Sequence, residues 1–302
     1  MYSKSIEMVE VAPRDGLQNE QSLVATDNKL ALIGRAIAAG SRRIEVTSFV
    51  NPKAVPQMAD AEAVCAGLPE RDDVTYIGLV MNARGAGRAL ATGRIDQLGA
   101  VAVATDSFAM ANQGQTSDGS VEAARDIIAM ARDAGKSGQV TIGAAFGCPF
   151  EGEVAQDRVV AMAVALAAAE PVEIGLADTI GVANPAHVAS LIVKLRTALP
   201  EMPIRVHFHN TRGTGLANVW SAILAGAVTV DASIGGLGGC PFAPGAAGNV
   251  STEDVVYMLE RAGIRTGLDL SQLVSANHWM AEVMQRNLPG MVAKAPFFPG
   301  QS

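Results

Sequence analysis

Short apolar runs alternate with longer amphipathic segments along most of the chain, and this alternation predicts repeated strand–helix units. The apolar runs that predict strands lie near residues 7–12, 42–48, 74–81, 98–105, 139–146, 172–177, 203–209 and 228–234. The segments that predict helices lie near residues 26–39, 55–66, 84–92, 119–134, 154–169, 185–199, 215–225 and 251–262. The strand runs are largely apolar rather than alternating, which is typical of parallel strands covered on both faces.

Eight strand–helix units over about 260 residues match the size of a closed (β/α)8 TIM barrel of the α/β class. An open doubly wound sheet is the alternative, because a series of elements does not reveal whether the sheet closes. We expect one catalytic domain over residues 1–302, with the barrel at about 5–264 and a C-terminal helical extension at 265–302. That extension contains one further predicted helix near 268–286.

Composition and net charge indicate how the core is built and which partners and compartments are expected. Hydrophobic residues make up 49 % of the chain and aromatic residues only 4 %, so Ala, Val, Ile, Leu and Met must build the core. The net charge of -7 argues against nucleic acid as a partner. Three widely spaced cysteines, Cys65, Cys148 and Cys240, favour a reducing compartment. We find neither a secretory signal nor a stretch long enough to span a membrane, and we predict a cytoplasmic protein without a membrane partner.

Polar residues recur where the predicted strands end. His207 and His209 are two residues apart in a strand and therefore share a face, which is half of a metal site. Arg14 and Asp15 follow the first strand, Glu45 lies in the second and Asp178 ends the sixth. In a barrel these positions gather at the C-terminal ends of the strands, where barrel enzymes carry their sites. Taken singly, the same residues are also consistent with a packed or surface histidine, a loop ion pair and a turn cap.

Five motifs together resemble the 3-hydroxy-3-methylglutaryl-CoA lyase family of metal-dependent barrel lyases. They are Val9–Glu20, Ile44–Phe49, Asp178–Gly181, His207–His209 and the glycine-rich stretch Gly235–Asn249, which we interpret as a mobile lid carrying Cys240. The resemblance covers nearly all of residues 5–265. It implies a TIM barrel, a divalent cation and cleavage of a 3-hydroxyacyl-CoA to acetyl-CoA and a keto acid.

The resemblance also implies roles for individual residues. The metal ligands it implies are Asp15, His207, His209 and Asn249. The catalytic residues it implies are Arg14 and Cys240, and the residues it places near the substrate are Arg14, Gln18, Glu45 and Asp178. A carboxylate, two imidazoles and an amide oxygen suit Mg²⁺ or Mn²⁺.

A mechanism follows from these groups. The cation would bind the tertiary hydroxyl of the substrate, while Asp15 or one of the site histidines, a choice that stays open, removes its proton. Arg14 would stabilise the enolate that forms when the bond between C2 and C3 breaks, and Cys240 would protonate it.

The sequence departs from the family at positions that bear on the substrate. Asn210 and Arg212 stand where the family usually has an aspartate and an aromatic residue. Met110–Asn112 lacks the two basic residues that commonly precede the asparagine, and Gly175 replaces a common serine. The segment Thr141–Ala145 is poorer in hydroxyl and thiol groups. We therefore expect a pocket that is differently shaped around the acyl group.

The first hypothesis is cleavage of 3-hydroxy-3-methylglutaryl-CoA to acetyl-CoA and acetoacetate, with a small-molecule acyl-CoA as the partner and a homodimer as the expected assembly. A related lyase for citramalyl-CoA or a longer 3-hydroxy-3-alkylglutaryl-CoA is an alternative. A Claisen-type condensing synthase is another, although such enzymes usually carry a long C-terminal regulatory extension. A non-catalytic barrel has no need of this residue set.

Overall fold

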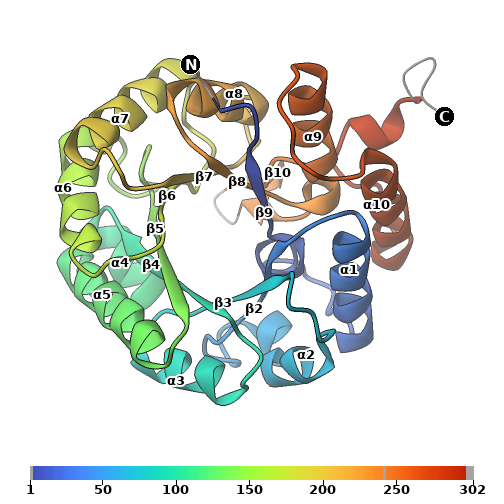
Figure 1. Ribbon diagram of the computed structural model, residues 1–302, viewed down its shortest axis with the longest axis horizontal. Coiled ribbons are helices and arrows are strands. Elements are labelled where there is room, and N and C mark those ends of the chain that lie inside the picture. Colours follow the sequence, from blue (N-terminus) through green and yellow to red (C-terminus); the bar gives the residue numbers. More distant parts are fainter. Residues whose placement is uncertain (1–2, 241–242, 297–302) are drawn as a thin grey trace.

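The computed structural model describes residues 3–240 and 243–296, with the side chains of residues 240–247 left undescribed. Eight parallel strands form a closed barrel in chain order (Figure 1). They are β1 (Glu7–Glu10), β2 (Arg43–Ser48), β3 (Thr75–Leu79), β4 (Gln97–Val103), β5 (Ser137–Gly143), β6 (Ile174–Asp178), β7 (Ile204–Phe208) and β8 (Thr229–Ala232). The last strand pairs in parallel with the first, with Val9 opposite Asp231. This closure confirms the predicted (β/α)8 barrel and excludes the open sheet.

Helices surround the barrel, and each strand is followed by at least one of them (Figure 1). They are α1 (Thr26–Ala38), α2 (Ala61–Gly67), α3 (Ala83–Ala91), α4 (Asp106–Gln113), α5 (Ser117–Asp133), α6 (Gln156–Ala167), α7 (Pro185–Ala198), α8 (Gly215–Ala225) and α9 (Thr252–Arg261). Local chemistry sets several ends. The side chain of Asn184 accepts a hydrogen bond from the amide of His187 at 3.0 Å, with Pro185 at the first helical position. Helix α8 ends at Gly226, whose φ of 112° favours glycine.

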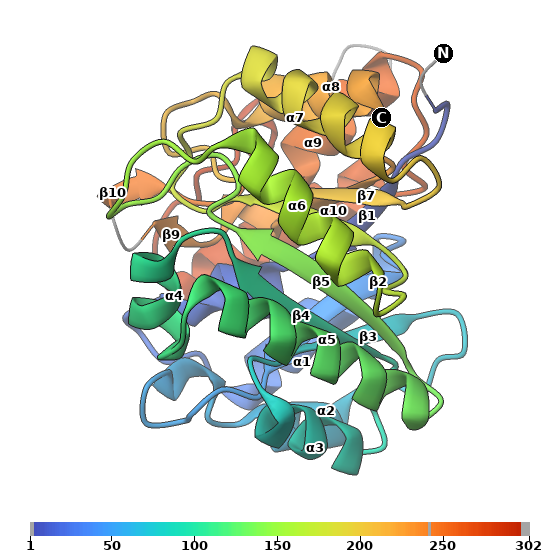
Figure 2. The same cartoon turned by 90° about the vertical axis from the view of Figure 1, so that its left-hand side faces the viewer.

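Three elements at the C-terminal end of the barrel were not expected. Helix α4 is an extra helix between β4 and α5, and a π-helical turn, η1 (Ala12–Gly16), follows β1. The glycine-rich stretch contains a small antiparallel pair, β9 (Gly239–Cys240) and β10 (Ala243–Ala247). Figure 2 shows α4, β9 and β10 at the same end of the molecule. The stretch interpreted as a lid therefore contains a pair of antiparallel strands.

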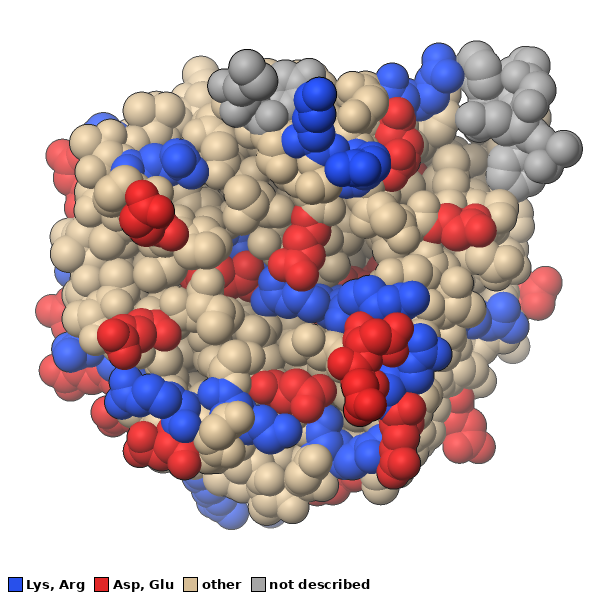
Figure 3. Space-filling view, in the orientation of Figure 1, with Lys and Arg blue, Asp and Glu red and all other residues tan. Residues whose placement is uncertain are grey.

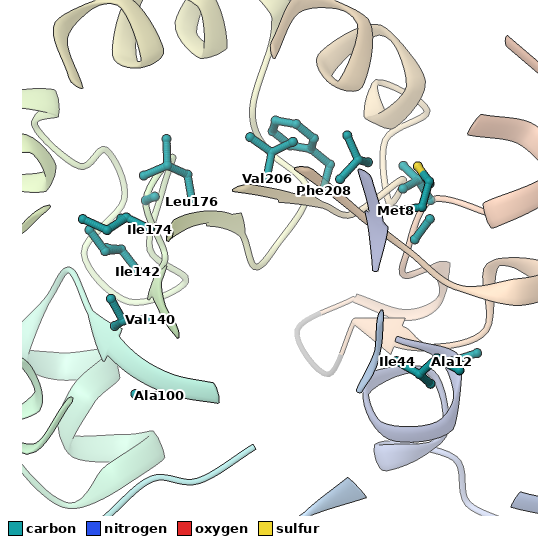
Figure 4. Packing of buried hydrophobic residues seen from close by; sticks show 14 of the residues in the cluster. Met8, Ala12, Ile44, Ala100, Val140, Ile142, Ile174, Leu176, Val206 and Phe208 are labelled. Atoms are coloured by element: carbon teal, nitrogen blue, oxygen red, sulfur yellow. The ribbon is translucent and has the colours of Figure 1, made fainter. Parts of the chain in front are cut away.

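The hydrophobic core lies between the strands and the surrounding helices. Val206 and Phe208 are buried and lie on the side of β7 that faces the helices (Figure 4). Because side chains alternate along a strand, Arg205, His207 and His209 point to the other side, into the barrel. The strand that carries the two imidazoles is thus fixed by apolar packing on its outer face.

The C-terminal extension packs beside the first helix and beneath the glycine-rich stretch. Its helix α10 (Leu270–Met284) contacts α1, where the guanidinium of Arg35 lies 4.5 Å from the ring centre of Trp279. It also contacts the short turn η3 (Ile234–Gly236) that begins the glycine-rich stretch. The amide of Gly290 donates to the carbonyl of Gly235 at 2.9 Å. The extension therefore braces the base of this stretch from outside.

Surface charge is mixed in sign. On the face in Figure 3, lysines and arginines are interspersed with aspartates and glutamates, and neither sign forms a continuous patch. Within the described part of the chain, no helix has both the length and the apolar character that crossing a bilayer requires.

Candidate active site

A cavity of about 550 Å³ opens among the C-terminal ends of the strands, where the sequence predicted the site. Its lining is divided by chemistry. The charged and histidine side chains in the lining are Arg14, Asp15, Glu45, Arg205, His207, His209 and Asp231. The apolar side chains in the lining include Leu79, Met81, Val101, Val103, Phe108, Ala111, Phe150 and Ala177.

Asp15, His207 and His209 form a cluster that could hold a metal ion. One carboxylate oxygen and one nitrogen from each ring lie within 4.8 Å of one another. Nδ1 of His209 is buried and has no hydrogen-bond partner among the described residues, so one nitrogen of a cluster imidazole lacks a protein partner. The amide nitrogen of Asn249 donates to Oδ2 of Asp15 at 2.7 Å and to the carbonyl of Leu237 at 3.0 Å, so Asn249 lies beside Asp15 with its NH2 group turned toward the carboxylate. The carboxylate and the two imidazoles fit a divalent cation.

Arg14 lies beside the cluster, between two carboxylates. Its Nη1 is 2.6 Å from Oδ1 of Asp15, and its Nε donates to Oε1 of Glu45. The turn η1 delivers Arg14 and Asp15 to the cavity, whereas Glu45 comes from the interior face of β2. A fixed guanidinium therefore borders the cluster, with its orientation set by Glu45.

Two buried charged residues that the sequence reasoning missed complete the polar half. Asp231 accepts a hydrogen bond from Nδ1 of His207 at 3.1 Å, which directs Nε2 of that ring toward Asp15. Arg205 donates to both carboxylate oxygens of Asp231 and lies 3.8 Å from Oε2 of Glu45. One signal was available, because Arg205 precedes His207 by two residues and must share its face. The pairing with Asp231 across strands was not visible in the sequence.

The pKa values of the two imidazoles are shifted in opposite directions. Burial lowers the pKa of His207, but the hydrogen bond with Asp231 and the charge of Asp15 outweigh it, so this pKa is raised overall. Burial, followed by the charge of His207, lowers the pKa of His209 to about 4. Burial alone would raise the pKa of Asp15, yet Arg14 and the two histidines lower it. Asp15 is thus ionised and His209 neutral near pH 7, which are the forms that bind metal.

The remaining predicted residues are placed as follows. Gln18 lines the cavity, and its Oε1 is buried without a hydrogen-bond partner among the described residues. The backbone of Cys240 lies in β9, but its side chain is outside the described part of the structure.

Asp178 is fully buried and is not among the residues that line the cavity. Its carboxylate accepts from the amides of Val182 and Ala183 at 2.9 and 3.0 Å. The structure does not support the expected contact of Asp178 with substrate, because these amides use its oxygens to fix a turn.

Three of the sequence departures have local structural explanations. Asn210 accepts from the amide of Gly215 at 3.0 Å, and Arg212 donates to the carbonyls of Ile180 and Gly181 at 2.7 and 3.0 Å. Both side chains therefore tie loops together, and neither lines the cavity. At position 175, a Cβ atom would lie 2.7 Å from Oγ1 of Thr141, so glycine makes room for that threonine.

A closed (β/α)8 barrel with a carboxylate and two imidazoles clustered at one rim is the architecture of a metal-dependent barrel enzyme. Comparison with known proteins then gives the family. Residues 5–280 match the HMGL-like family model, and the chain belongs to this family. This confirms the family prediction and, with it, the expectation of a carbon–carbon lyase.

Individual relatives are similar over almost their whole lengths. An (R)-citramalyl-CoA lyase from Chloroflexus aurantiacus is 41 % identical, over 98 % of this chain and 96 % of the relative. A hydroxymethylglutaryl-CoA lyase from Bacillus subtilis is 40 % identical, over 95 % and 96 %. Among solved structures, an HMG-CoA lyase from Acinetobacter baumannii in complex with coenzyme A and 3-methylmalate has a TM-score of 0.93 at 38 % identity, covering 100 % of this chain and 98 % of that one.

Proposed function

We propose that this protein is a divalent-metal-dependent lyase that cleaves a 3-hydroxy-3-methylglutaryl-CoA-type thioester to acetyl-CoA and a keto acid, acetoacetate by default. The observation that carries the proposal is the cluster of Asp15, His207 and His209 directly beside the guanidinium of Arg14 in one cavity. The names of the relatives support it, because two of the most similar are acyl-CoA lyases of this chemistry.

Asp15, His207 and His209 would hold the cation, together with Asn249, whose amide group would turn over so that its oxygen takes the place of the nitrogen that faces Asp15. Mg²⁺ and Mn²⁺ suit this oxygen- and imidazole-rich set better than metals that prefer thiolates. When bound, the cation supplies the positive charge that polarises the tertiary hydroxyl of the substrate. Asp231 keeps His207 in the tautomer whose Nε2 faces the cluster.

The other residues would handle the proton and the developing charge. Asp15 or a site histidine removes the proton of the 3-hydroxyl group, and the bond between C2 and C3 breaks as the keto acid forms. The electron pair moves onto the thioester as an enolate, where the guanidinium of Arg14 stabilises the negative charge. Cys240, on the stretch above the cavity, donates a proton to C2 and completes acetyl-CoA.

Citramalyl-CoA is the second candidate substrate, because the (R)-citramalyl-CoA lyase is as similar to this chain as the hydroxymethylglutaryl-CoA lyases are. Both compounds would give acetyl-CoA and differ only in the keto acid released. A cytoplasmic location, a homodimer and a single domain over residues 1–302 remain predictions.

The test is a discontinuous assay of acetyl-CoA release from purified 3-hydroxyacyl-CoA thioesters in the presence of Mn²⁺, with the keto acid identified by mass. We expect acetyl-CoA from at least one 3-hydroxy-3-methyl thioester, in equal amount to its keto acid. Absence of acetyl-CoA from every thioester, with a folded and metal-loaded protein, would refute the proposal.

A further inference from the structure

The cavity described above has two unlike halves, and only the polar one is used by the proposed chemistry. The groups that would hold metal and stabilise the enolate come from η1, β2, β7 and β8. Across the closed barrel lie β3, β4 and β5 with the segments that follow them, and most of the side chains that they contribute to the lining are apolar, with Asn112 and Thr141 as polar exceptions. We define the apolar wall as Leu79, Met81, Val101, Val103, Phe108 and Phe150.

The apolar wall cannot neutralise a substrate carboxylate. Of the lysines and arginines among the described residues, only Arg14 and Arg205 line the cavity. Both lie in the polar half, and both are already paired with carboxylates. Burying a charged group against the apolar wall would be strongly unfavourable, whereas burying hydrocarbon there is favourable. The apolar wall therefore favours binding of a hydrocarbon group of the substrate over binding of a charged group.

Free space lies next to the apolar wall. Gly143, at the end of β5, lines the cavity and has no positive φ that would require glycine. A Cβ built there would lie at ordinary van der Waals distance from the carbonyl oxygen of Ala102, at 3.6 Å, and from Cγ2 of Val103, at 3.9 Å, so a methyl group would fit. Its neighbour in the lining from β6, Ala177, is also small. The backbone conformation at position 143 does not require glycine, and the absence of a side chain there leaves room in the cavity.

The apolar character continues to the surface. Phe150 is 54 % exposed although it lines the cavity, and its ring centre lies 6.1 Å from that of Phe108. Met110, on α4 between the lining residues Phe108 and Ala111, is 55 % exposed. Large apolar side chains at the rim of a pocket mark a surface that is covered when a ligand binds.

We propose that the apolar wall receives a hydrocarbon substituent on the 3-carbon of the substrate, and that this substituent is larger than methyl. The preferred substrate is then a 3-hydroxyacyl-CoA whose oxygens face the polar half while an alkyl or aryl group fills the space beside Gly143. This inference rests on the proposed lyase function and narrows its substrate class.

The experiment compares a series of 3-hydroxyacyl-CoA thioesters that differ only in the 3-substituent, from methyl to butyl and phenyl. Binding is titrated calorimetrically in excess chelator, and cleavage is followed separately with Mn²⁺ as release of acetyl-CoA. We expect both affinity and kcat/KM to rise by about tenfold or more from methyl to the preferred larger group, as apolar pocket contacts usually discriminate.

Two variants test where the substituent lies. Gly143→Ala adds one methyl group at the end of β5, and Val101→Phe enlarges a side chain that lines the cavity from the neighbouring strand β4. Each should lower kcat/KM for the larger substituents by about tenfold or more relative to kcat/KM for the methyl substrate. Gly34→Ala is the matched control, because a Cβ at that helix position meets no atom within 4 Å. It should leave the whole series unchanged.

The outcomes separate this inference from the proposed function. Equal or better binding and cleavage of the methyl substrate would overturn the inference and leave the lyase function intact. Equal losses for every thioester in Gly143→Ala and Val101→Phe would also overturn it, because they would assign the wall to the coenzyme A arm. Tighter binding of larger substituents without any acetyl-CoA release would support the inference and refute the lyase function.

Discussion

Arg14 contacts two carboxylates at once, and these contacts fix the position of its guanidinium. Its Nε donates to Glu45, which is 2 % exposed, and its Nη1 contacts Asp15 at 2.6 Å. A guanidinium cannot lose its charge at any physiological pH, and its planar fork fits both partners at once. The charge is therefore in place before substrate arrives, as electrostatic stabilisation of an enolate requires.

Substituting Arg14 by methionine should lower turnover by about 10³, the usual loss when a preorganised charge is removed. Arg14→Lys should recover only part of this loss, since an ammonium cannot reach both carboxylates in the same geometry. Rates are measured at saturating Mn²⁺, with circular dichroism to check the fold. Near-normal turnover in a folded Arg14→Met variant would exclude its role in stabilising the enolate.

Asp231 contacts the proposed metal site through its hydrogen bond with His207. Because its carboxylate fixes Nδ1 of that ring, Asp231→Asn should weaken Mn²⁺ binding by about 10- to 100-fold, as loss of such partners usually does. The measurement is a Mn²⁺ titration followed by electron paramagnetic resonance.

Asp254→Asn is the matched control for this titration. Asp254 is also buried, but it accepts from the backbone amides of Met291 and Val292 and does not line the cavity. It should lose stability without a change in Mn²⁺ affinity. Equal Mn²⁺ affinities in wild type and Asp231→Asn would show that His207 needs no orienting partner.

At the scale of elements, the base of the glycine-rich stretch is held by a buried carboxylate. Glu10, at the end of β1, accepts from the amides of Ala12 and Ile234 at 2.8 and 3.0 Å and from the hydroxyl of Thr252 at 2.8 Å. These contacts join β1, the turn η3 and helix α9. Burial raises the pKa of Glu10 from 4.5 to about 8, against the effect of its hydrogen bonds.

The raised pKa of Glu10 predicts a pH dependence of stability. Between pH 4.5 and about 8 the folded state holds a proton on Glu10 that the unfolded state has lost, so stability falls as pH rises through this window. Glu10→Gln keeps the shape but cannot ionise, and should remove a loss on the order of 3 kcal/mol by pH 8. Urea unfolding of both proteins at pH 5 and pH 8 checks this. A difference between them that does not change with pH would contradict it.

The elements themselves were largely predictable, for physical reasons. Strands such as β4 are largely apolar because both faces are buried, and Gly226 and Asn184 mark helix ends by their local chemistry. Helix α4 was missed because it spans only Asp106–Gln113 and directly precedes the longer α5. The pair β9–β10 was missed because glycine-rich sequence gives no alternation of apolar and polar positions.

At the scale of the whole molecule, closure of the barrel is what assembles the site. Asp15 and Asn249 are far apart in sequence, yet their side chains are joined by a 2.7 Å hydrogen bond. The motifs identified which residues to expect, and the structure brings Arg14, Asp15, His207, His209 and Asn249 together. The sequence could not reveal the contact of Asp231 with His207, because it depends on which strand lies beside β7. It also could not reveal that Asp178 is fully buried.

The proposed metal site is tested most directly by a Mn²⁺ titration of metal-stripped protein with acetyl-CoA release measured at each addition. We predict negligible cleavage without metal, activity that rises in proportion to bound Mn²⁺, and a plateau at one ion per chain. His207→Ala should bind Mn²⁺ weakly and stay inactive in the same titration. Full activity in thoroughly stripped protein, or activity unrelated to bound Mn²⁺, would contradict the central claim that this rim holds a catalytic cation.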